Sequence, residues 1–153
     1  MDVLQIIKSD HAELKRKLGL VVHAETKPKF LELFKFLVSD LRLQLKLEGD
    51  YLHPELGILL NGSSSEFLSR SQQSHKSLVR KIGVIEKGLK NAPIADLRKS
   101  VEQLAAAVND HLVYQEAVMM PRLRERMPTP EREDLGAVIL DVKEAELSQR
   151  LAQ

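Results

Sequence analysis

Residues 97–118, LRKSVEQLAAAVNDHLVYQEAV, carry the pattern that decides the fold. Apolar side chains recur there every three or four residues, at Leu97, Val101, Leu104 and Val108, so they share one face of an α-helix. The positions between them are rich in Ala, Gln and Glu, which are good helix formers. The segment therefore predicts an amphipathic helix, and polar residues interrupt its stripe toward the carboxyl end.

Comparable stripes occur in three other segments, with breakers at Lys27-Pro28, residues 54–65, residues 91–93 and residues 127–130. The regular spacing is typical of an all-α, antiparallel up-down four-helix bundle with an additional C-terminal helix, in one domain spanning residues 1–153. The predicted helices run from a capping box at Asp2 and Gln5 to the low twenties, from 28 to 54, from 65 to 90, from 93 to 120, and onward from Thr129-Pro130.

Composition excludes several classes of protein. The chain has 153 residues, no cysteine and a formal net charge of +1. Disulfides, thiol catalysis and thiolate metal sites are excluded, and no global charge argues for nucleic acid or an anionic membrane. The start lacks the features of a signal peptide, and no apolar run is long enough to span a membrane. We expect a cytoplasmic protein.

Residues 41–48, LRLQLKLE, alternate strictly between apolar and polar, as in a strand. We predict a helix instead, because the run lacks β-branched and aromatic residues and continues a longer helical stripe. The extra leucines then cover a second face of this helix. That face is expected to contact the fifth helix or another subunit, as in a homo-oligomer.

Polar and ionisable side chains interrupt all four main stripes, and a core tolerates such groups only when they are paired or bound. Counting from turns predicted near Asn61 and Asn91, at about 1.5 Å per residue, places Glu48, His75 and His111 at nearly one level. Imidazole and carboxylate together suit iron, manganese or zinc. The interruptions are His11, whose level fits less well, then Gln44, Glu48, His75, His111 and Gln115, with Glu116 beside them.

At these residues the chain resembles the hemerythrin-like, or HHE cation-binding, family. The resemblance rests on Asp10-His11, on His75, and on the motifs Gln44-x-x-x-Glu48 and His111-x-x-x-Gln115-Glu116. In both motifs a Pro-x-Leu begins ten residues after the first position, at Pro54 and at Pro121. The resemblance covers nearly the whole chain. It implies a four-helix bundle around a non-haem di-iron centre that handles O₂, peroxide, nitric oxide or iron.

Some positions depart from the family pattern. Gln44 stands where the family has His, and Gly49 follows Glu48 where a second carboxylate is common. Some members carry a second His on the third helix, but Ser71 and Val79 do not supply it. The resemblance implies His11, Glu48, His75, His111 and Glu116 as metal ligands. Gln44 is a further candidate, and Tyr51, Tyr114 and Gln115 are candidates for additional ligation or for hydrogen bonds to the site.

The expected function is binding of one or two non-haem iron ions and of a small molecule at an open position. The same ligands serve a carrier, a sensor and an enzyme with peroxidase-like or catalase-like activity, so this choice stays open. Two alternatives remain: a metal- or redox-responsive interaction module, and a degenerate bundle that keeps its polar layer without metal. His53, which precedes Pro54, is expected to cap a helix end at the surface.

Overall fold

The computed structural model describes residues 1–60 and 65–152, and all the elements found in them are helical. The predicted turn near Asn61 lies outside these residues. Residues 41–48 are helical, as predicted. In chain order the elements are α1 (Val3–Val22), α2 (Lys27–Leu47), η1 (Glu48–Leu52), α3 (His53–Leu60), α4 (Ser65–Gly88), α5 (Ile94–Tyr114), η2 (Gln115–Met119), α6 (Met120–Arg126) and α7 (Thr129–Ala152).

The helix starts follow the local chemistry of the sequence. The side chain of Asp2 accepts a hydrogen bond from the backbone N–H of Leu4, and the side chain of Gln5 accepts one from the N–H of Asp2. This capping box satisfies N–H groups that the first turn leaves unpaired. At α2 the side chain of Thr26 accepts a hydrogen bond from the N–H of Lys29, and Pro28 lies in the first turn, where its missing N–H is not needed.

Two helices continue past the prolines at which the sequence predicted them to end. α2 passes through η1, a π-helical turn, into α3, and Pro54 lies in the first turn of α3. α5 passes through η2, a second π-helical turn, into α6, with Pro121 at the same position. The predicted ends at residues 54 and 120 are therefore wrong. A proline disrupts an α-helix by removing one hydrogen bond of the ladder, and here the ladder already changes register at the preceding π-turn.

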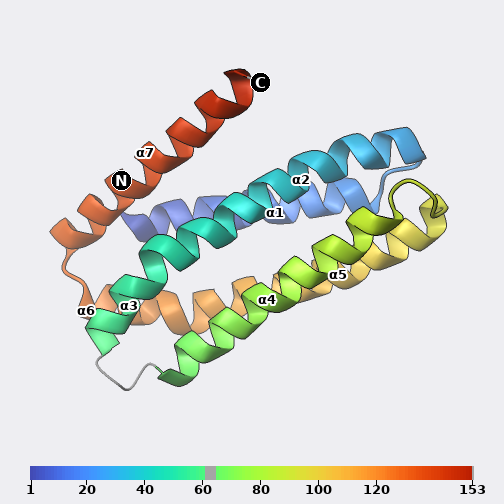
Figure 1. The fold of residues 1–153 in the computed structure, drawn as a ribbon. Helices are drawn as coiled ribbons and strands as arrows, with labels where there is room; N and C mark the ends of the chain where they lie inside the picture. The colour runs from blue at the N-terminus through green and yellow to red at the C-terminus, as the bar shows by residue number, and fades with distance from the viewer. Residues whose placement is uncertain (61–64, 153) are drawn as a thin grey trace.

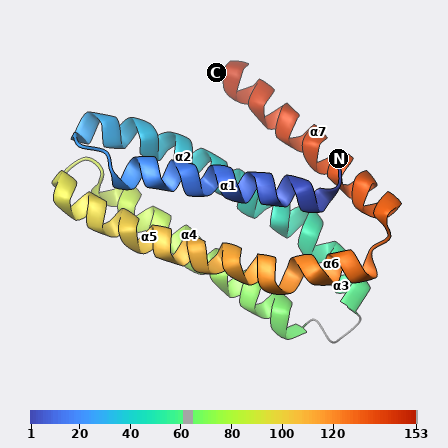
Figure 2. The ribbon, with the colours of Figure 1, turned by 180° about the vertical axis from the view of Figure 1, so that it is seen from behind.

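The helices form a bundle of four long rods with α7 crossing them. Figures 1 and 2 show α1, α2–α3, α4 and α5–α6 lying lengthwise beside one another, while α7 runs at an angle over the amino-terminal part of α1. None of the helices in the described part of the chain is both long and apolar enough to cross a bilayer.

Two apolar clusters fill the bundle, one toward each end. The first lies toward the α1–α2 turn and includes Phe34 and Ile82. The second lies at the other end of the rods and includes Leu56 and Met119. Between the two clusters, each of the four rods places polar side chains in the interior.

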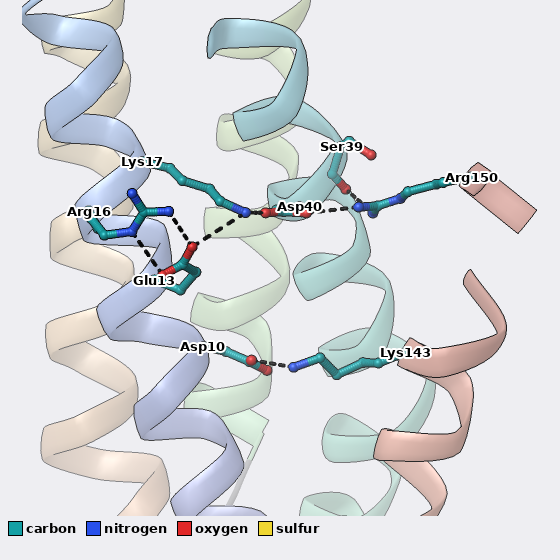
Figure 3. A network of polar contacts seen from close by, with 8 residues as sticks. All are labelled: Asp10, Glu13, Arg16, Lys17, Ser39, Asp40, Lys143 and Arg150. Atoms are coloured by element: carbon teal, nitrogen blue, oxygen red, sulfur yellow. Dashed lines mark hydrogen bonds and ion pairs between the residues drawn. The ribbon is translucent and has the colours of Figure 1, made fainter. Parts of the chain in front are cut away.

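Ion pairs and one close backbone contact attach α7 to the bundle. Figure 3 shows Asp40 of α2 between Lys17 of α1 and Arg150 of α7, whose guanidinium lies 2.9 Å from the carboxylate. Lys143 of α7 pairs with Asp10 of α1. These partly exposed pairs fix the orientation of α7 more than they stabilise it, because exposed ion pairs contribute at most about 1 kcal/mol each.

The leucine-rich second face of α2 is largely covered by other parts of the same chain. Leu45 and Leu47 are buried, and Leu43 lies in a groove that α7 borders with Glu146 and Arg150. Contact with the fifth helix was one of the two expectations for this face.

Gly136 provides a test of how α7 docks. A Cβ added at Gly136 would lie 2.2 Å from the backbone oxygen of Met1, whereas one added at Gly83 of α4 would meet nothing within 4 Å. We expect Gly136→Ala to lower the free energy of unfolding by about 1–3 kcal/mol through overpacking. Gly83→Ala, the matched control, should raise it by about 0.4–1 kcal/mol. Urea denaturation measures both, and equal effects would contradict the close packing of α7 on α1.

Candidate metal centre

The buried polar side chains between the two apolar clusters form a polar layer, and the carboxylate of Glu48 lies at its centre. Glu48 stands at the start of η1, is 0% exposed, and receives side chains from two other helices. Its Oε2 atom is 2.6 Å from Nε2 of His75 on α4 and 2.9 Å from Nε2 of His111 on α5. One ligand atom from each of the three residues lies within 4.8 Å of the others. The common level predicted for these residues by counting is therefore found.

The two imidazoles keep Glu48 ionised. Burial by itself would raise the pKa of this carboxyl group, because a charge is poorly solvated inside a protein. Hydrogen bonds from His111 and His75 outweigh burial, and the pKa of Glu48 is lowered below its ordinary value. The interior of the bundle thus holds a negative charge whose compensation comes from nitrogen donors on two neighbouring helices.

A hydroxyl group orients one of these imidazoles. Ser74 Oγ lies 2.9 Å from Nδ1 of His111, on the side of the ring away from Glu48. Because a hydroxyl can either donate or accept, Ser74 can hold the ring in both tautomers. Such a partner on the second nitrogen is the usual companion of a metal-binding histidine.

His53 is buried beside the cluster, so the prediction that it caps a helix end at the surface is wrong. It is 8% exposed, its Nε2 lies 2.8 Å from Ser71 Oγ, and its ring centroid is 5.0 Å from that of His75. Burial first, and then the proximity of His75, lowers the pKa of His53 to about 4. Sequence reasoning missed it because five residues along an α-helix turn a side chain about 140° away from Glu48.

His11 forms a second cluster with residues of η2. Its Nδ1 is 2.9 Å from Glu116 Oε1, and its Nε2 is 3.0 Å from Gln115 Oε1. The hydrogen bond from His11 lowers the pKa of Glu116, against a smaller opposing effect of burial. The Nε2 atom of Gln115 is buried without a hydrogen-bond partner among the described residues. His11 and Glu116 lie outside the group of three that Glu48 forms.

Gln44 stands next to Glu48 on the second rod. Its Nε2 donates to the other carboxylate oxygen of Glu48, Oε1, at 3.4 Å. The two oxygens of Glu48 therefore have different partners. Oε2 contacts the imidazoles of His75 and His111, whereas Oε1 contacts the side-chain amide of Gln44.

The two tyrosines pack against apolar groups. Tyr114 stacks on Phe67, with ring centroids 5.5 Å apart, and the guanidinium of Arg70 lies over its ring. Tyr51 is half-buried against the apolar cluster that contains Leu52.

The donor chemistry of the main cluster fits a metal ion. Two imidazoles and one carboxylate are the ligand set of many non-haem iron(II) and some zinc sites, with further positions left open. A divalent cation would compensate the charge of Glu48 and use the nitrogens that now donate to it. The fold and this cluster together define an all-helical protein with a candidate carboxylate–histidine metal site.

The family assignment agrees with this class. The family model described as the hemerythrin HHE cation binding domain matches residues 2–138, so the chain belongs to that family. No curated protein and no solved structure matched the chain.

The charge of Glu48 can be tested without metal. We expect Glu48→Gln to lower the free energy of unfolding by about 2 kcal/mol in the presence of a chelator. Each of its two hydrogen bonds to histidine loses the extra strength, about 1 kcal/mol, that an ionised acceptor provides. The control is Glu86→Gln, which removes an exposed ion pair with Arg42 and should change the free energy by less than about 1 kcal/mol. Equal effects in urea denaturation would count against an ionised, buried Glu48.

Proposed function

We propose that this protein binds non-haem iron in its polar layer and presents it to O₂, peroxide or nitric oxide. The observation that carries the proposal is the convergence of Glu48, His75 and His111 in a chain of the HHE cation-binding family. In this proposal the four rods follow an antiparallel up-down order around the metal, as in other bundles with metal sites in their cores.

The first metal position would be held by Glu48, His75 and His111. Two of these side chains are almost fully buried, and His75 is 16% exposed. Glu48 is fully buried between the two apolar clusters, and this low-polarity environment strengthens the attraction between a cation and its carboxylate. Ser74 would fix the ring of His111 while its other nitrogen binds.

A second metal position, which would make the centre di-iron, has poorer donors. His11 and Glu116 supply one nitrogen and one carboxylate, and Gln44 and Gln115 add only amide oxygens. Oε1 of Glu48 contacts Gln44 rather than an imidazole, so this carboxylate would also be available to a second ion held with Gln44. We expect the second ion to bind more weakly than the first.

Bound iron would supply a redox-active Lewis acid with positions open to a small molecule. The chain's own residues would hold that centre and control access to it. A groove lined by His53, His75, Gln72 and Lys76 leads from solvent to the exposed edge of His75. Zinc or manganese would suit the same donors.

A metal-free polar layer is the second candidate. It is favoured by the hydrogen bonds that already pair His75 and His111 with Glu48, and His11 with Glu116.

Metal content separates the two candidates. Protein loaded anaerobically with Fe²⁺ and desalted should retain about one ion per chain, measured by elemental analysis, because the second position has poorer donors. His75→Leu with His111→Leu should abolish retention and the rise in melting temperature that metal produces, because ligand binding stabilises only the folded state. The control is the exposed His23→Leu, which should retain iron. A double variant that is more stable than the parent, with no iron bound by either, would support the metal-free layer.

The second position can be strengthened. Gln44→His replaces an amide by an imidazole, a better ligand for a divalent transition metal, and should raise the iron content by about one ion per chain. The control is Gln103→His at an exposed position of α5, which should leave the content unchanged. If Gln44→His retained the same number of iron ions per chain as the parent protein, this result would argue against a second position beside Glu48.

A further inference from the structure

We propose that His53 is a further ligand of the metal held by Glu48, His75 and His111. The inference rests on the proposed metal binding and adds a residue that belongs neither to the group of three nor to the second cluster.

The π-helical turn brings His53 to the side of Glu48. The backbone N–H of His53 donates to the carbonyl oxygen of Glu48, five residues earlier. In an α-helix this separation would point the two side chains about 140° apart. A turn closed by an i to i+5 hydrogen bond is wider, so this angle is smaller and the His53 ring meets that of His75.

The surroundings of His53 differ from those of the other histidines in the interior of the bundle. His11, His75 and His111 each contact a carboxylate, whereas the hydrogen bond described for the ring of His53 goes to the neutral hydroxyl of Ser71. The His53 ring is therefore not tied to a carboxylate, and only its contact with Ser71 has to be given up when it turns toward the metal.

The ring of His75 contacts the rings of both other histidines near Glu48. The ring centroids of His53 and His75 are 5.0 Å apart, and those of His75 and His111 are 5.1 Å apart. The His53 ring now leans toward Ser71 and stands outside the group within 4.8 Å. Binding requires the ring to turn about its side-chain bonds from Ser71 toward the group, while the backbone stays in place.

The groove beside the site makes the proposal testable by chemical rescue. His53 and His75 both line it, together with Gly49 and Gly57, which leave its wall free of side chains at their positions. Removing the His53 side chain therefore opens a space, connected to solvent, that imidazole from solution can enter.

The experiment uses Co²⁺ as the probe, with its dissociation constant measured by competition against a chelator and its visible absorption recorded. We expect His53→Gly and His53→Gln to weaken Co²⁺ binding by about tenfold or more, because losing a ligand should cost at least as much as losing one of its hydrogen-bond partners. Their absorption should differ from that of the parent protein, and millimolar imidazole should restore both properties to His53→Gly. Far-ultraviolet circular dichroism without metal checks that each variant is folded. His53→Gln places a side chain of comparable size at the position of the imidazole, so it does not leave a cavity.

Two controls separate ligation from packing. Ser71→Ala removes a partner that the His53 ring leaves when it turns toward the metal, so this variant should bind Co²⁺ at least as tightly as the parent. His23→Gln, at the exposed end of α1, should change nothing. Affinity lost equally in Ser71→Ala and the His53 variants, without rescue, would show a structural pair and overturn the proposal.

Different results would contradict the role of His53 and the proposed metal binding. Unchanged affinity and absorption in both His53 variants would overturn this inference alone. A parent protein that binds neither Co²⁺ nor Fe²⁺ would overturn the proposed function and this inference with it.

Discussion

The buried negative charge of Glu48 is the constraint on which the rest of the interior depends. A carboxylate at 0% exposure is tolerated only where donors or cations compensate for its lost hydration. His75 and His111 provide that compensation from two other helices, at 2.6 and 2.9 Å. Three of the four rods are thus aligned along their length by one carboxylate, since a shift of one helical turn, about 5.4 Å, would break the contacts.

The apolar packing is organised around this layer. One cluster fills the bundle toward the α1–α2 turn, and the other fills the end where α3, α6 and α7 meet. The polar layer lies between them, with His11, Glu48 and His111 all buried. This division gives the polar groups a dry environment while each cluster supplies the hydrophobic stabilisation of its own half.

Much of the fold was predictable, because the stripes of leucine and valine fix which face of each helix is buried. The cap at Asp2, the helical state of residues 41–48 and the meeting of Glu48 with His75 followed from local patterns and from counting. The π-turns did not, since no local signal distinguishes them from an α-helix that ends near a proline. The burial of His53 depends on such a turn and was missed for the same reason.

The π-turn at residues 48–52 also makes the site sensitive to chain length. Such a turn holds one residue more than the α-helical path would need. Deleting a single residue there would let the rod close into a regular α-helix and would rotate everything beyond it by about 100° relative to Glu48. Within this segment, insertions and deletions would therefore alter the site in ways that substitutions cannot, and a relative without the extra residue would turn a different side chain toward the interior.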